Sequence, residues 1–194
     1  MKNLNLFTVC SLVMMLNVTS CTLLAKSLEK KTEKINYSNN YSNFKWGVAT
    51  SGYQIEGDNK PSIWSERDTK KGIDSQTYGN NFRKYHDKWI ELAKNLNVNA
   101  FRLSIEWSRV QPRKPQGNDD GFDQNEINFY KDLISSLKRK NNIEPFVTLL
   151  HFNYPKWLND ETNSRGILDP KFGEYYLKYV EKIANEISPD VSYW

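Results

Sequence analysis

From residue 44 onward, segments typical of strands alternate with segments typical of helices, and this alternation constrains the fold more than any other feature. In residues 99–107, apolar and polar side chains alternate with period two, which predicts a strand. Residues 143–150 are apolar on both faces, as in a buried parallel strand. A strand near residues 46–50 precedes both, and residues 191–194 have the composition of a further strand that is starting.

Amphipathic helices are predicted between these strands. Residues 80–96 form the first, with an expected buried stripe of Phe82, Trp89, Leu92, Ala93 and Leu96. A second follows a loop of Gly, Asn and Asp at residues 117–121 and carries Ile127, Tyr130, Ile134 and Leu137 at helical spacing. The third spans about 171–187, with Phe172, Tyr176, Tyr179, Ile183 and Ile187 on one side.

This order predicts an α/β fold with a parallel sheet and right-handed crossovers. A closed (β/α)₈ (TIM) barrel takes about 250 residues, whereas this sequence has 194. We therefore expect a partial (β/α)₈ barrel, with about three completed βα units and the start of a fourth strand.

The bulk composition is that of an ordinary soluble domain, with 38% hydrophobic residues, 26% charged residues and a net charge of +4. The small basic excess does not accompany any nucleic-acid-binding motif, so we expect no nucleic acid partner. The high aromatic share of 13% provides flat faces that can stack on sugar rings, although most such rings pack in cores.

The N-terminus has the layout of a targeting segment, which we assign to residues 1–25. Lys2 is followed by an uncharged apolar run that is too short to span a membrane comfortably. The run ends in Val18-Thr19-Ser20-Cys21, which resembles the lipobox of bacterial lipoproteins. Two alternatives stay open: lipidation of Cys21, which would give a membrane anchor, or ordinary cleavage nearby, which would give a secreted protein.

Residues 26–43 are rich in Lys, Asn and Ser, and we interpret them as a flexible tether before a folded part at 44–194. The two cysteines, Cys10 and Cys21, both lie in the targeting segment. We therefore expect no disulfide and no zinc site built from thiolates in the mature chain. Nothing in the sequence implies another metal or an organic cofactor, so we expect none.

Three long motifs in the folded part resemble glycoside hydrolase family 1. Residues 44–57 read FKWGVATSGYQIEG, with PSIW at 61–64. Residues 99–110 read NAFRLSIEWSRV, and residues 144–152 read EPFVTLLHF, with Pro112, Pro155 and Leu158 in step. The resemblance runs from residue 44 to residue 194 and covers about the first third of a family member. It implies a retaining β-glycosidase on a complete barrel, with a β-glycoside as substrate.

By that resemblance, Gln54 and His151 would hydrogen-bond hydroxyls of the non-reducing sugar. An amide offers a donor and an acceptor together, and a neutral imidazole can donate from one nitrogen. Both positions fall at strand ends, where such barrels place their active sites. Without the motifs, Gln54 would be interpreted as a turn residue and His151 as a core histidine.

Arg102 lies on the polar face of its strand, and its guanidinium needs a partner if that face points into the barrel. Glu106 shares the face but lies about 13 Å along an extended strand, too far for direct pairing. The resemblance implies that Arg102 supports the catalytic nucleophile; the alternative is a surface ion pair. Neither Glu56 nor Glu106 matches a catalytic position, and we expect Glu106 to be structural.

Retaining hydrolysis uses two carboxyl groups about 5–5.5 Å apart. In the family, the acid/base Glu follows a Trp-x-Thr-x-Asn-Glu-Pro segment whose first residue matches Trp194, and the nucleophile lies later. We therefore expect these 194 residues to lack both catalytic groups and to be inactive alone. The alternatives are a non-catalytic sugar-binding remnant, or one half of a split glycosidase completed by a C-terminal chain. Departures from the family pattern are Asn153 for Asp, Asn80-Asn81 for Asp-His, and Ile167 for Trp.

Overall fold

The structure is a computed structural model that describes residues 44–74 and 79–194. The predicted signal segment, its Cys21 and the predicted tether at 26–43 lie outside the described residues. In the described part, no helix is both long enough and apolar enough to cross a membrane.

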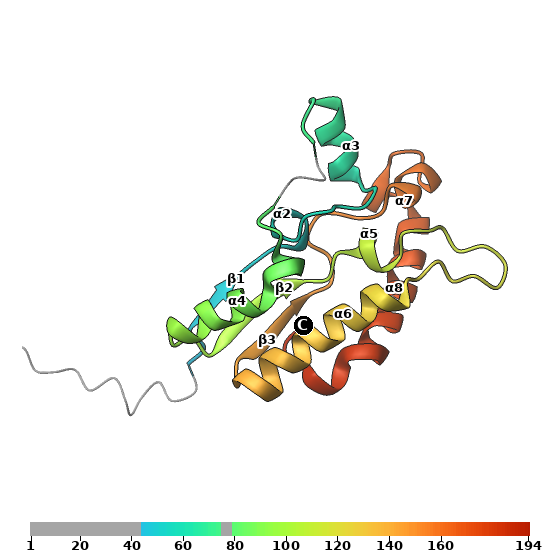
Figure 1. Cartoon of the computed structure of the whole chain (residues 1–194). Helices are drawn as coiled ribbons and strands as arrows, with labels where there is room; N and C mark the ends of the chain where they lie inside the picture. The colour runs from blue at the N-terminus through green and yellow to red at the C-terminus, as the bar shows by residue number, and fades with distance from the viewer. Residues whose placement is uncertain (1–43, 75–78) are drawn as a thin grey trace, which may run out of the picture. The chain divides into compact units, whose positions relative to one another are not determined.

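Three parallel strands form one sheet in the order β1-β2-β3, as predicted (Figure 1). These are β1 (Gly47–Ala49), β2 (Ala100–Ser104) and β3 (Glu144–Thr148). Val48 of β1 aligns with Phe101 of β2, and Phe101 aligns with Pro145 of β3. The crossover helices are α4 (Phe82–Asn95) and α6 (Gln124–Ser135), and α8 (Pro170–Ile187) follows β3. This is the βα succession of a partial barrel.

A fourth parallel position begins at Tyr193, which forms an isolated bridge to Phe146. The two rings stack with centroids 4.3 Å apart, and the Val147 N–H donates to the Tyr193 carbonyl at 2.9 Å. The strand expected at residues 191–194 is therefore represented by this single pairing on the outer side of β3.

Short helices follow the carboxyl end of each strand and build the rim of the sheet. Helices α2 (Gly52–Ile55) and α3 (Ile63–Lys70) come after β1, α5 (Trp107–Val110) after β2, and α7 (Lys156–Glu161) after β3. A π-helical turn, η1 (Ser136–Lys140), extends α6, and the 3₁₀ turns η2 (Gly166–Leu168) and η3 (Ser188–Asp190) flank α8. The alternation of apolar residues did not reveal these short helices.

Local sequence explains where the helices begin. The Asp123 side chain accepts from the backbone N–H groups of Asn125 and Glu126 and so caps α6. Asp169 caps α8 through the Lys171 N–H, and proline follows it at the first helical position. Helix α3 begins with a capping box in which Ser62 and Ser65 satisfy each other's backbone N–H groups.

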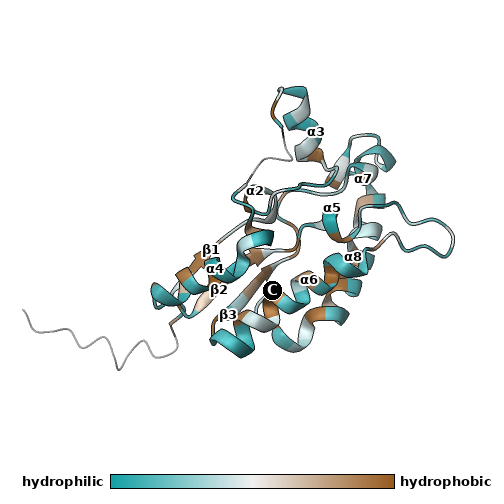
Figure 2. Cartoon of the chain, in the orientation of Figure 1, coloured by the Kyte–Doolittle hydropathy of each residue, from teal (hydrophilic) through white to brown (hydrophobic). Residues whose placement is uncertain are grey.

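The core lies between the sheet and its helices, where apolar side chains from both layers pack together. In Figure 2, hydrophobic stretches of the ribbon occur in both the strands and the helices. Phe101 and Leu103 of β2 and Val147 of β3 face this layer. Trp107 is fully buried, and its ring stacks on that of Tyr179, with centroids 4.5 Å apart. The predicted stripe of the second helix is confirmed, because Ile127, Tyr130 and Ile134 of α6 and Leu137 of η1 are each at most 1% exposed.

Three details of the sequence prediction are wrong. Leu92 and Leu96 are 57% and 66% exposed, whereas Phe82 and Ala93 of the predicted stripe are buried, together with Ile90, which was not predicted. β3 is buried on one face only, since Phe146 and Thr148 are half-exposed on the other. The strand predicted at 99–107 ends at Ser104, because Trp107 already starts α5.

Candidate functional site

Gln54, Arg102 and His151 come from three adjacent parallel strands. Gln54 lies in α2 just after β1, Arg102 lies within β2, and His151 follows β3 by three residues. Parallel strands present their carboxyl ends at one edge of a sheet, which is the rim where (β/α)₈ enzymes place their sites. We call this edge the carboxyl rim.

Arg102 connects the first two strands at this rim. Its Nη1 donates to the Thr50 carbonyl, and the Thr50 N–H donates back to the Arg102 carbonyl at 2.9 Å. The Arg102 residue is half-buried, and it forms no ion pair with a carboxylate in the described part of the chain. Its guanidinium is therefore held by backbone and retains donors directed elsewhere.

His151 is half-buried next to Arg102. Burial lowers the pKa of the His151 imidazole, and the positive charge of Arg102 lowers it further. The ring is therefore neutral at pH 7, with one nitrogen as donor and the other as acceptor. The Phe152 ring meets it edge-on, with centroids 5.3 Å apart.

Gln54 presents an exposed side chain on α2. The helix is anchored beneath the rim by the Gly52 N–H, which donates to Ser104 Oγ of β2 at 2.7 Å. Two residues beyond Gln54, Glu56 pairs with Arg109 of α5, with Nε and Oε2 3.0 Å apart. Contacts at both ends thus hold the short α2 in place. The Gln54 side chain is exposed between them, so its amide is accessible to a ligand.

Glu56 and Glu106 are both 4% exposed and serve the structure around the rim. Tyr130 Oη lies 2.8 Å from Glu56 Oε1 and accepts from the Glu106 N–H at 3.2 Å. Arg109 also donates from Nη2 to the Gly57 carbonyl at 2.7 Å. Because neither carboxyl reaches the surface, neither can attack or protonate a sugar. The Glu106 position agrees with its expected structural role.

Asn153 is a site residue that sequence reasoning noted only as a departure from the family pattern. It is 3% exposed, and its Nδ2 donates to Glu106 Oε1 at 2.8 Å, while its Oδ1 accepts from the Trp64 N–H at 3.2 Å. Ser108 Oγ donates to the same Glu106 oxygen at 2.9 Å. Desolvation, together with the nearby negative charge of Glu56, raises the pKa of Glu106 from 4.5 to about 7.

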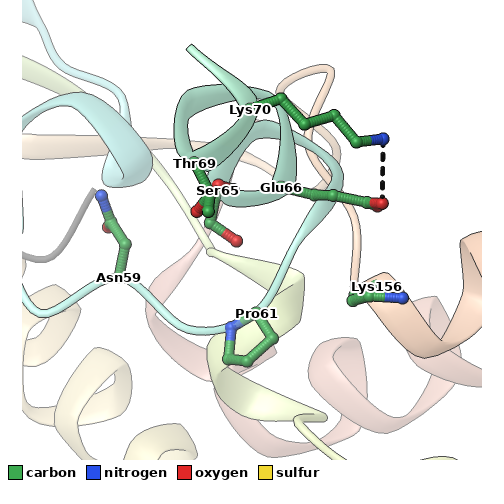
Figure 3. Close-up of a pocket in the computed structure, with 7 residues that line it drawn as sticks. All are labelled: Asn59, Pro61, Ser65, Glu66, Thr69, Lys70 and Lys156. Carbon is green, nitrogen blue, oxygen red and sulfur yellow. Dashed lines mark hydrogen bonds and ion pairs between the residues drawn. The ribbon is translucent and has the colours of Figure 1, made fainter. Parts of the chain in front are cut away.

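A separate hollow of about 420 Å³ lies between α3 and α7 (Figure 3). Its two lysines are both engaged: Lys70 pairs with Glu66 at 3.1 Å, and Lys156 pairs with Asp160 at 2.8 Å. Within residues 44–74 and 79–194, no three His, Cys, Asp or Glu side chains are grouped to hold a metal ion.

Comparison with known proteins identifies the family to which this chain belongs. The model of glycosyl hydrolase family 1 matches residues 37–194. Beta-glucosidase 24 of Arabidopsis thaliana is 33% identical over 174 residues, which are 85% of this chain and 32% of that protein. Raucaffricine-O-beta-D-glucosidase of Rauvolfia serpentina is 32% identical and aligns with 83% of this chain and 31% of its own length.

Solved structures agree with the sequence comparisons. A family 1 β-glucosidase from the fungus Humicola insolens, in complex with glucose, superposes with a TM-score of 0.66 at 32% identity, covering 78% of this chain and 32% of that one. The enzyme from Exiguobacterium antarcticum gives 0.67 at 31% identity, covering 79% and 34%. The chain therefore belongs to glycosyl hydrolase family 1, and it spans about a third of the length of the relatives it matches.

Proposed function

We propose that this chain forms the sugar-binding N-terminal section of a retaining β-glucosidase barrel. The observation that carries the proposal is the neutral imidazole of His151 beside Arg102, on the same rim as the exposed Gln54 amide. Neutral donors and acceptors suit the hydroxyl groups of a sugar, which are uncharged at all accessible pH values. Arg102 is proposed to support the nucleophilic carboxylate of the complete enzyme, since its guanidinium has donors left after binding Thr50.

Sugar binding can be tested on the 194-residue chain by nuclear magnetic resonance. Glucose at up to 100 mM should shift the imidazole signals of His151 and the side-chain amide signals of Gln54. His86 is the matched control, because this other histidine lies half-buried on α4, which does not contribute to the rim. Shifts at His86 alone, or at neither histidine, would reject the proposal.

We also propose that a polypeptide of these residues alone does not hydrolyse glycosides. A retaining mechanism needs two carboxyl groups that reach the sugar, whereas the carboxyls of Glu56 and Glu106 are buried in hydrogen bonds. Purified chain should release 4-nitrophenol from an aryl β-glucoside no faster than buffer does. Turnover that is clearly above buffer, and that is lost in His151→Ala, would contradict this.

In the alternative of a split enzyme, an apolar surface beside β1 is where a second polypeptide would complete the barrel. β1 pairs with β2 on one side, and beside it Val48, Trp89, Leu92 and Leu96 line a cavity of about 380 Å³. A polypeptide that supplies a parallel strand and an amphipathic helix would pair with the β1 edge and cover Leu92 and Leu96. The other alternative, a non-catalytic sugar-binding remnant, needs no such partner.

The DNA that follows the Trp194 codon decides between these alternatives. A separate frame that encodes a Thr-x-Asn-Glu-Pro segment is expected for a split enzyme, and co-expression of its product should restore hydrolysis. The double change Leu92→Lys and Leu96→Lys should abolish that recovery, whereas Leu177→Lys, at a similarly exposed site on α8, should not. Without such a frame, the split-enzyme proposal fails.

For the N-terminus, we propose export, with Cys21 as the lipidated residue. Mass spectrometry of the protein expressed in a bacterium should find an acylated cysteine as the first residue. The Cys21→Ala variant should lack the acyl group and leave the membrane fraction. A mature protein that starts at another residue without acylation would support the secreted alternative instead.

A further inference from the structure

We propose that Glu106 and Asn153 form a positioning pair that holds the turn at residues 151–153, so that His151 faces the carboxyl rim. This inference deepens the proposed sugar-binding function and rests on it. Glu106 lies two residues after β2, directly before α5, and Asn153 comes two residues after His151. Their link, Nδ2 to Oε1 at 2.8 Å, therefore joins the His151 turn to the segment that follows β2.

The turn needs such an anchor because of its backbone. Phe152 has a φ of 61°, in the left-handed region that residues with a side chain seldom adopt. Its ring is 73% exposed, so burial of the ring does not compensate for the conformation. The strain must then be balanced by contacts on either side of Phe152.

Those contacts are present on both sides. Before the turn, the Leu149 carbonyl accepts from Tyr179 Oη at 2.8 Å. After it, Asn153 is the first buried residue, and its amide bridges the Glu106 carboxyl and the Trp64 backbone N–H. Asn153 thus fixes the turn to the start of α5 and to the start of α3 at once.

The residue type at 153 matches this task. An amide can donate to a carboxylate and accept from an N–H at the same time, which a carboxylate cannot do. An aspartate at this position would place a second carboxyl within hydrogen-bond distance of Glu106, in a site that already holds Glu56 close by. Asparagine at 153 is therefore suited to glutamate at 106, and the pair works as a unit.

The test measures His151 in the full 194-residue chain, without sugar, by titrating its imidazole signals. Asn153→Ala should raise the pKa of His151 toward the ordinary value of about 6.5, because the released ring moves away from Arg102 into water. Ser108→Ala is the matched control, since it removes the other side-chain donor to the same Glu106 oxygen and leaves Asn153 in place. An unchanged pKa of His151 in Asn153→Ala, or an equal change in Ser108→Ala, would overturn the proposal.

A second variant keeps the test decisive if Asn153→Ala does not fold. In Asn153→Asp, one shared proton can bridge the two carboxyls at pH 5, whereas at pH 8 they repel. The contact between the His151 and Phe152 rings, seen as a nuclear Overhauser effect, should be retained at pH 5 and lost at pH 8. Retention at both values would contradict the proposed role. The groups facing Glu106 that also titrate or carry charge are Glu56, Arg109, Tyr130 and Tyr179.

The sugar experiment then separates this inference from the function on which it rests. If glucose shifts the His151 signals in the wild type and not in Asn153→Ala, both the sugar-binding function and the positioning role are supported. If glucose leaves the wild-type His151 unchanged while Asn153→Ala still raises its pKa, the pair positions the turn but the sugar role fails.

Discussion

Glu56 and Arg109 form an ion pair inside the protein, with Oε2 and Nε 3.0 Å apart and side chains only 3% and 1% exposed. Glu56 directly follows α2, which carries Gln54, and Arg109 belongs to α5 after β2. The pair therefore fixes the rim segments of two adjacent strands relative to each other. Tyr130 of α6 adds a hydrogen bond to Glu56 from the helical layer.

Replacing Arg109 by Met should lower the free energy of unfolding by about 3–5 kcal/mol at pH 7, because it leaves the Glu56 carboxylate buried without its partner. Burial raises the pKa of Glu56 already, and the loss of the guanidinium removes a charge that opposes this rise. The loss of unfolding free energy should therefore be smaller at pH 5, where Glu56 binds a proton more readily. Urea unfolding at the two pH values measures both effects.

The matched control for that change is Glu66→Gln, which removes the Glu66–Lys70 pair on α3. The Lys70 side chain is 74% exposed, so solvent screens this pair and the cost should stay below about 1 kcal/mol. Equal losses in Arg109→Met and Glu66→Gln would mean that the buried pair has no special structural role.

Glu106 should make stability depend on pH between about 4.5 and 7. Its pKa is raised from 4.5 to about 7 in the folded chain, mainly by burial. The folded state thus keeps a proton that the unfolded state releases, so the stabilising contribution is complete below 4.5 and is lost as the pH rises to 7. The loss should amount to about 3 kcal/mol, at about 1.4 kcal/mol for each unit of pKa difference.

Comparison with Glu106→Gln isolates this effect. The glutamine has no proton to release, yet it keeps an acceptor for Ser108 and Asn153. The stability of the wild type should therefore fall relative to the variant between pH 4.5 and 7. Parallel stability curves for the two proteins over that range would contradict a raised pKa at Glu106.

The sequence allowed the sheet and its main helices to be predicted, because periodicity reports which side chains face the core. The stripe from Ile127 to Leu137 and the parallel order of the strands are cases in which local pattern and packing agree. Leu92 and Leu96 show the limit of this reasoning. They have the right spacing for a buried face, yet burial depends on what lies opposite, and α4 meets the sheet through Ile90 and Ala93.

The positions of the candidate site residues were predicted in a different way. The family motifs placed Gln54 and His151 at strand ends and Arg102 on the strand between them, and parallel pairing brings strand ends to one rim. Periodicity gave no signal for Asn153, because its role depends on two partners that are 47 and 89 residues away in the sequence. The roles of Gln54, Arg102 and His151 toward a sugar remain predictions, which the experiments above test.

Tyr179 should stabilise the segment that leads to His151. Its hydroxyl is buried and donates to the Leu149 carbonyl at 2.8 Å. Tyr179→Phe should cost about 1–2 kcal/mol of unfolding free energy, because the carbonyl loses its partner in a site that excludes water. Tyr193→Phe, at a residue that is 42% exposed, should cost less than half as much. Thermal unfolding of both variants tests this, and equal losses would contradict it.

Gly117 and Gly121 allow backbone strain to be separated from steric overlap in one loop. Both have positive φ values, 56° and 75°, at which a side chain is disfavoured. A Cβ added at Gly117 would meet nothing within 4 Å, whereas one added at Gly121 would lie 2.1 Å from the Arg113 carbonyl oxygen. Gly117→Ala should therefore cost about 1 kcal/mol, and Gly121→Ala about 2 kcal/mol more.

The effect of Gly121→Ala should also reach the core. The Asp120 carbonyl accepts from Gln111 Nε2 at 2.9 Å, and Gln111 Oε1 accepts from Trp107 Nε1 at 2.8 Å. A shift of the loop at residue 121 would therefore disturb the hydrogen bond of the buried Trp107 indole. Its N–H resonance should move in Gly121→Ala and stay in place in Gly117→Ala. Movement of that resonance in both variants would show that strain alone, without overlap, displaces the loop.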